Sequence, residues 1–90
     1  MAERIMEIRI SPAVEFKLRT KHQLTGDIVR EAIQYPAKSR CHWQFHNIYG
    51  WRLQAFGFLD SGYVVVAYLY QIDDSYEIWS LGTAFRKVRK

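Results

Sequence analysis

The sequence predicts an α+β fold: an antiparallel β-meander with two short N-terminal helices packed on one face, in the order β-α-α-β-β-β-β. Two segments with helix-capping residues occupy the first third of the chain, and from residue 40 the hydrophobic pattern changes to the period of two that is typical of strands. Turn residues divide this second part into strand-length segments. Because 90 residues are too few for two independent cores, we expect a single domain over residues 1–90.

A strand and a helix are expected at the start of the chain. Residues 4–10 have the alternation of a strand. Its inward side is predicted to carry Met6, Ile8 and Ile10. Ser11 is then a good N-cap, and Pro12 suits the first helical position because its backbone angle is already helical. The pattern therefore predicts a first helix over residues 12–21.

The second helix is predicted over residues 26–34. Thr25 is its N-cap, Asp27 places a negative charge in the first turn, and Pro36 stops it. The two helices and the central strand are expected to supply much of the core: Val14, Leu18, Ile28, Val29, Ile33, Val64, Val66 and Leu69.

Strands account for the rest of the chain. The first of them alternates Cys41, Trp43 and Phe45 with His42, Gln44 and His46. A strand over residues 51–58 is joined by the hairpin Asp60-Ser61-Gly62 to an apolar central strand over residues 63–70.

The end of the chain is expected to return once along the sheet and then leave it. The acidic turn Asp73-Asp74-Ser75 leads into a last strand over residues 76–81. Gly82 is predicted to let the chain depart as a basic tail, because residues 84–90 carry four cations and no acid.

Composition narrows the class of partner. The chain has 13 Lys and Arg against 9 Asp and Glu, so its net charge of +4 favours anionic partners, meaning nucleic acid or an acidic protein. Cys41 is the only cysteine, which excludes an internal disulfide and a cysteine-based zinc site. No apolar stretch approaches a membrane span or a signal peptide, so we expect a soluble, cytoplasmic protein with no membrane partner.

The histidines are the first candidates for chemistry. Lys21-His22 lies between the two predicted helices, where a group that titrates near neutrality sits beside an ammonium; alternatively, both are solvated residues of a helix end. His42 and His46 lie on one face of a strand but about 13 Å apart, too far to share a metal. We therefore expect neither a metal site nor a cofactor.

Aromatic and basic residues are interleaved in the strands. The rings are Trp43, Tyr49, Trp51, Tyr68, Tyr70 and Trp79, and the basic residues are Arg40, His42, His46 and Arg52. Such rings stack on unpaired bases while cations hold phosphates. A small sheet also needs rings for its core, so we assign most of them to packing and at most two to a surface.

Several short motifs follow one another between residues 16 and 86. They are Lys21-His22-Gln23-Leu24-Thr25, Pro36, an Arg-x-x-x-x-Gly segment from Arg52 to Gly57, the apolar run 64–69, Asp73-Asp74 and Glu77-Ile78. In their order and spacing the chain resembles the BrnT-like toxins, compact members of the RelE-fold ribonuclease group from bacterial type II toxin–antitoxin systems. It departs from the family at the end of the last strand, where Phe85 stands at the place of an arginine and Arg86 follows it.

The resemblance implies a RelE/BrnT-like fold, metal-independent endoribonuclease activity on RNA, and a cognate antitoxin as partner. RNA cleavage needs a base, an acid and cations around the phosphate. The candidates are His22 as acid or base, Lys21, Arg52 and Arg86 for the phosphate charge, and His46 and Tyr49 for a leaving oxygen or a stacked base. We expect Lys21 and His22 within about 12 Å of Arg52 on one concave surface, because one phosphate must touch all three.

Two other functions remain open. An inactive relative of these toxins would bind nucleic acid or protein without cleaving it, and Phe85 favours this alternative. A structural interaction protein would dock a partner on the aromatic side of its sheet and needs no catalysis.

Overall fold

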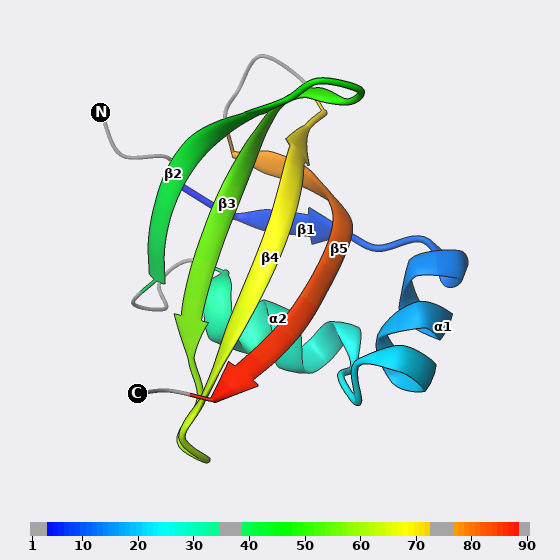
Figure 1. Ribbon diagram of the computed structural model, residues 1–90, viewed down its shortest axis with the longest axis vertical. Coiled ribbons are helices and arrows are strands. Elements are labelled where there is room, and N and C mark those ends of the chain that lie inside the picture. The colour runs from blue at the N-terminus through cyan, green and yellow to red at the C-terminus, as the bar shows by residue number, and fades with distance from the viewer. Residues whose placement is uncertain (1–3, 35–38, 73–76, 89–90) are drawn as a thin grey trace.

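The computed structural model describes residues 4–34, 39–72 and 77–88, which form two helices and a five-stranded mixed sheet (Figure 1). The elements are β1 (Glu7–Arg9), α1 (Pro12–Lys21), α2 (Gly26–Ile33), β2 (Ser39–His46), β3 (Gly50–Phe58), β4 (Tyr63–Gln71) and β5 (Ile78–Val88). The predicted α+β class and the predicted order of elements are therefore confirmed. Neither helix in the described ranges is long and apolar enough to cross a membrane.

The strands lie in the order β1-β5-β4-β3-β2. Strands β2 to β5 form the predicted antiparallel meander. The first strand departs from that prediction, because β1 pairs in parallel with β5, with Glu7 beside Ile78. Parallel neighbours require a long crossover connection, and here the two helices and the meander supply it, so that the first and last strands meet.

Both helices begin where capping residues predict. The hydroxyl of Ser11 accepts the N–H of Val14 at 3.2 Å, and the hydroxyl of Thr25 accepts the N–H of Ile28 at 3.2 Å. The carboxylate of Glu15 in α1 also accepts the first N–H of α2, and this contact ties the two helices together. Pro36, which was expected to stop α2, lies outside the described residues.

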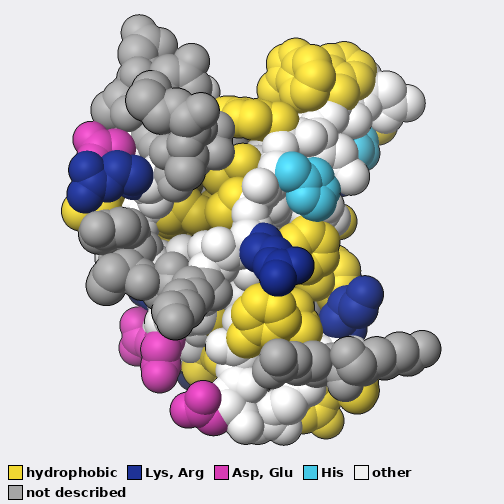
Figure 2. All heavy atoms as spheres, turned by 90° about the vertical axis from the view of Figure 1, so that its left-hand side faces the viewer, with side chains coloured by type: hydrophobic (Ala, Val, Ile, Leu, Met, Phe, Trp, Pro, Cys, Tyr) yellow, Lys and Arg dark blue, Asp and Glu magenta, His cyan; other side chains and the backbone are white. Residues whose placement is uncertain are grey.

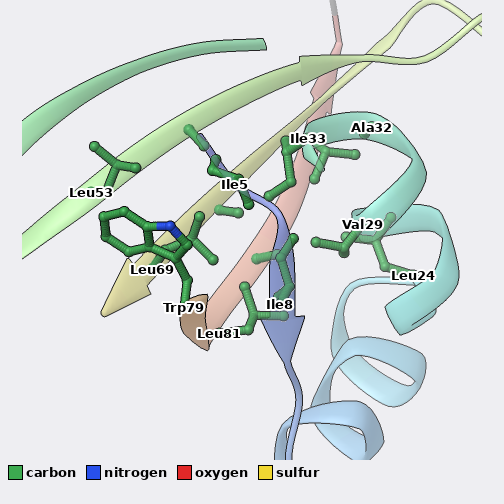
Figure 3. Packing of buried hydrophobic residues seen from close by; sticks show 14 of the residues in the cluster. Ile5, Ile8, Leu24, Val29, Ala32, Ile33, Leu53, Leu69, Trp79 and Leu81 are labelled. Carbon is green, nitrogen blue, oxygen red and sulfur yellow. The ribbon is translucent and has the colours of Figure 1, made fainter. Parts of the chain in front are cut away.

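The core lies between the helices and one face of the sheet (Figure 3). Its members are Ile5, Ile8, Leu18, Leu24, Val29, Ala32, Ile33, Leu53, Ala55, Val65, Ala67, Leu69, Trp79, Leu81 and Ala84. Of the predicted core residues, Leu18, Val29, Ile33 and Leu69 belong to it, and Val14 and Ile28 pack against it half-buried. Val64 and Val66 are buried too, but the alternation along β4 places them on the other side of the sheet.

The expected inward side of the first strand is wrong at one position. Ile5 and Ile8 are buried, whereas Met6 is 41% exposed. The backbone N–H groups of Met6 and Glu7 both donate to the carbonyl oxygen of Glu77, at 3.0 and 3.2 Å. This double contact breaks the regular alternation, so two residues three apart point into the core.

The last strand is longer than predicted. Tyr68 pairs with Thr83 and Leu69 with Leu81, so Gly82 is an extra residue in a β-bulge rather than the end of the sheet. A Cβ on Gly82 would lie 2.3 Å from the Tyr70 ring, and glycine therefore lets that ring cross the strand. Arg86 and Lys87 consequently remain in β5, while the acidic turn at residues 73–75 and the final residues 89–90 lie outside the described ranges.

Alternation gives the sheet two different sides. One side packs against the helices, and we call the opposite side of β2–β5 the open face. The alternating positions beside the buried core residues place on it Arg40, His42, Gln44, His46, Arg52, Gln54, Phe56, Tyr68, Tyr70, Phe85 and Lys87. The open face therefore carries aromatic, basic and amide side chains around the buried residues Val64 and Val66, whereas the side toward the helices is mainly aliphatic.

Candidate nucleic-acid interface

The strands that build the open face are free of acidic residues. As the structure describes them, β2, β3, β4 and β5 contain no aspartate or glutamate. Figure 2 views the molecule from the β2 edge, and basic, histidine and hydrophobic side chains gather on the open-face side, while the acidic side chains visible in that view lie on the helix side. Every charged side chain that these strands place on the open face is therefore basic.

Arg52 lies on the open face beside the rings of Tyr68 and Tyr70. Its guanidinium carbon is 4.0 Å from the centroid of the Tyr68 ring. Its Nε donates to the Gln44 side-chain oxygen at 2.9 Å, and a terminal nitrogen is 3.5 Å from the Tyr70 hydroxyl. The Gln54 amide donates to the Tyr68 hydroxyl at 2.9 Å. These contacts hold the guanidinium over one ring and beside another, and no carboxylate of the described residues pairs with it.

A row of aromatic rings extends from Arg52 in two directions. His46 and Tyr49 stack with 4.9 Å between centroids, and Tyr49 meets Tyr70 edge-on at 6.2 Å. On the other side Tyr68 lies 6.4 Å from Phe85. The rings and Arg52 thus form a continuous surface from the β2–β3 turn to β5.

Two histidines of β2 lie on this surface. His42 stacks on Phe56 with 5.7 Å between centroids. The Nδ1 of His46 accepts the backbone N–H groups of Ile48 and Tyr49, at 3.1 and 3.2 Å. An accepting Nδ1 carries no proton, so the neutral ring of His46 holds its proton on Nε2.

A second group of candidates lies away from the open face. Lys21, His22, Gln23 and Arg86 line a pocket of about 220 Å³ at the junction of α1 and α2, which we call the basic pocket. Arg86 pairs with Val65, a core residue, so its side chain is on the helix side of the sheet. Its guanidinium carbon lies 4.7 Å from the centroid of the Tyr63 ring, and a terminal nitrogen donates to the Gln23 side-chain oxygen.

The end of α1 shapes the basic pocket. The N–H of Leu24 donates to the carbonyl of Leu18 at 2.9 Å, and Gln23 between them is in the left-handed conformation, with φ of 54°. Helices commonly end in this way, but with glycine at that position. A residue with a side chain there costs roughly 1–2 kcal/mol. The chain thus keeps a glutamine where glycine would be more stable.

The sheet divides the residues that the sequence singled out. Arg52, His46 and Tyr49 lie together on the open face, whereas Lys21, His22 and Arg86 line the basic pocket on the helix side. The expectation that Lys21 and His22 share a surface with Arg52 is therefore wrong. The reason is the alternation along β3: Leu53 is in the core, so its neighbour Arg52 points the other way.

The number of rings on a surface was also underestimated. Trp79 is buried and Trp43 packs against the core, but Tyr68 and Tyr70 are half-buried on the open face. Tyr49 and Trp51 are 66% and 63% exposed. The signal in the sequence was Tyr68 and Tyr70 standing two apart on either side of Leu69, which the apolar character of the whole strand obscured.

The amides were missed altogether. Gln44 and Gln54 position Arg52 and Tyr68, and Gln23 reaches Arg86 from the helix turn. Gln54 stands two residues after Arg52 in its strand, between the buried residues Leu53 and Ala55, and this spacing could have marked it as facing the same side as Arg52. Gln44 alternates with Trp43 and Phe45, and its place beside Arg52 follows only from the pairing of the two strands. Within residues 4–34, 39–72 and 77–88, no three His, Cys, Asp or Glu side chains gather as metal ligands.

Comparison with known proteins finds no relative of this chain. No protein-family model matches the chain, and no curated protein or solved structure matches it significantly. The resemblance to BrnT-like toxins rests on the order of its short motifs alone. The function must therefore be argued from the two sites themselves.

Proposed function

We propose that the protein binds single-stranded RNA on its open face. The observation that carries this proposal is Arg52, held over the Tyr68 ring at 4.0 Å within a row of rings on strands that contain no acid. Exposed rings stack on unpaired bases, and a fixed guanidinium pairs with phosphate or stacks on a base. Bases in a duplex are already paired and stacked, so this surface suits single strands.

The charge of the molecule supports the same partner. The net charge is +4, and Arg40 and Lys87 add cations at opposite sides of the open face. Phosphate contacts of this kind supply affinity regardless of sequence and weaken with salt. The rings and the amides of Gln44 and Gln54 are then available to contact bases.

A second candidate function is metal-independent RNA cleavage by a RelE/BrnT-like toxin. The observation that favours it is His46, whose Nδ1 is held by two backbone N–H groups next to Tyr49 and Tyr70. Its Nε2–H can donate a hydrogen bond to a phosphate oxygen, the Tyr49 hydroxyl can protonate a leaving oxygen, and Arg52 beside Tyr70 suits the charge on the phosphate. The division of the candidates by the sheet leaves His46, Tyr49 and Arg52 as the group that one RNA phosphate could meet.

Under this second candidate, a cytoplasmic antitoxin would restrain the protein. The β2–β3 turn offers such a partner an apolar surface, because Phe45, Ile48 and Trp51 are 60%, 76% and 63% exposed. Phe45 and Trp51 pack edge-on with 5.3 Å between centroids. Exposed rings clustered in this way are common at the centres of protein interfaces.

Fluorescence anisotropy with a labelled single-stranded RNA tests the binding function. We expect Arg52→Gln to weaken binding about tenfold and to lower the salt slope by about one unit, because one phosphate contact is lost. Lys17→Gln is the matched control, since it removes the same charge from an exposed position on α1. Equal affinities of these two variants would exclude the open face as the RNA site.

Incubation of the RNA with purified protein separates cleavage from binding. If the second candidate holds, His46→Ala lowers the cleavage rate by about 10²–10³ while binding persists, because one donor to the phosphate is lost. His22→Ala, in the basic pocket, leaves cleavage unchanged. Intact RNA after saturation with wild-type protein would leave binding as the function and exclude cleavage of that RNA.

A further inference from the structure

The basic pocket lies on the helix side of the sheet and is separate from the open face. Its four lining residues include two permanent cations, a histidine and an amide, and no acid. Glu15 of α1 is engaged with the N–H of Gly26 and with Arg19. The positive charge of the pocket is therefore not neutralised by its lining.

The geometry of the pocket suits a compact anion. Arg86 is fixed from two sides, by the Tyr63 ring and by the Gln23 side-chain oxygen, which leaves the rest of its planar fork free for a bidentate contact. The oxygen of Gln23 is used by Arg86, so its amide nitrogen remains as a donor. At about 220 Å³ the pocket is smaller than ordinary small-molecule sites and fits one anionic group of a larger ligand.

The backbone conformation of Gln23 indicates that its side chain has a function. Gln23 is the only non-glycine residue with positive φ in the described part of the chain, at 54°. Residues held in unfavourable backbone conformations cluster at functional sites, and they persist because the surrounding structure holds them there. Here the strained residue is the one that contacts Arg86.

We propose that the basic pocket binds a phosphate monoester, the terminal phosphate of an RNA strand. A terminal phosphate carries close to two negative charges, whereas each internal diester carries one, so a pocket with Lys21 and Arg86 favours the end of a chain. Arg86 and Lys87 are neighbours on β5, one in the pocket and one on the open face. Positive charge therefore continues around this end of the strand from one site to the other.

This inference rests on the proposed RNA binding, and a free mononucleotide is the other source of the same group. Anisotropy is measured with one RNA sequence in three forms: 5′-phosphorylated, 3′-phosphorylated and with hydroxyls at both ends. We expect wild-type protein to bind one phosphorylated form about tenfold more tightly than the hydroxyl form. Equal affinity for all three forms would overturn the proposal for RNA ends.

Variants distinguish the two sites. Lys21→Gln should abolish the preference for the phosphorylated form without changing affinity for the hydroxyl form, whereas Lys17→Gln, one turn earlier on α1, should keep it. Arg52→Gln should weaken all three forms and preserve their ratio. Loss of the preference in Lys17→Gln as well would show a general effect of charge and would contradict the pocket.

A titration with AMP and adenosine covers the case in which RNA does not bind. At fixed ionic strength, AMP and not adenosine should shift the backbone amide NMR signals of His22 and Gln23 in wild-type protein. Gln23→Gly should raise the melting temperature, because glycine suits φ of 54°, and yet weaken AMP binding. No shift with AMP, or undiminished AMP binding in Gln23→Gly, would overturn the pocket.

Discussion

On the helix side of the sheet, Leu53, Leu69 and Leu81 are fully buried among aliphatic neighbours, whereas on the open face Arg52 and Tyr68 hold each other in place at a half-exposed surface. Both sides are built by alternate residues of the same strands. The contacts on the helix side are dispersive and exclude water, while those on the open face are hydrogen bonds and ring contacts that still face water.

This difference means that stability and binding are carried by adjacent residues. Burial of apolar area dominates the free energy of folding, so the helix side should determine stability. The open face keeps polar groups that are not needed for stability. Substitutions of neighbouring residues in one strand should therefore change stability and RNA binding separately.

The largest effect is expected from Leu53→Ala. Leu53 is 0% exposed on β3, and removal of its side chain should lower the free energy of unfolding by about 2–5 kcal/mol. Urea denaturation followed by circular dichroism measures this change. A loss below about 1 kcal/mol would mean that the helix side is loosely packed and that the contrast between the faces is wrong.

Much of this contrast follows from local patterns in the sequence. Ser11 and Thr25 cap the two helices as predicted, and the hairpin at residues 60–62 joins β3 to β4. The parallel pairing of β1 with β5 could not be predicted, because it depends on how the helices return the chain to the sheet. Met6 was misplaced because both its N–H and that of Glu7 bind one carbonyl, a contact across strands that no local pattern reveals.

The candidate site was predicted in its residue types but not in its grouping. Lys21, His22 and Arg52 were grouped because of their charge, but which side of the sheet a strand residue faces depends on register. The bulge at Gly82 shows the same limit, because it keeps Arg86 on the helix side and leaves Phe85 on the open face. A glycine in a sequence marks either a bulge or an exit from the sheet, and only the partner strand decides between them.

A smaller effect is expected from Gly57→Ala, which tests how closely α2 is seated on β3. A Cβ at Gly57 would lie 2.4 Å from the carbonyl oxygen of Ala32 and 2.7 Å from Ile33 Cγ2. The helix must shift to admit it, at a cost of about 1–3 kcal/mol in the free energy of unfolding. Thermal denaturation measures this cost, and an unchanged melting temperature would show that α2 does not approach the strand there.

The smallest effect on stability is expected from Gln54→Ala, the neighbour of Leu53 in the chain. Its amide donates to Tyr68 on the open face, so its loss should cost about 1 kcal/mol or less. Measured beside Leu53→Ala under the same conditions, it gives the contrast between the two faces directly. Equal losses for the two variants would show that the open face also serves as a core.

The central claim is that RNA meets the open face, and the side-chain amide signals of three glutamines test it most directly. Gln44 and Gln54 contact Arg52 and Tyr68 on that face, whereas Gln34 at the end of α2 donates to Met6 on the helix side. In a ¹H–¹⁵N NMR titration with single-stranded RNA, the account predicts that the NH₂ signals of Gln44 and Gln54 shift while that of Gln34 stays in place. A shift of Gln34 with Gln44 and Gln54 unchanged would contradict it.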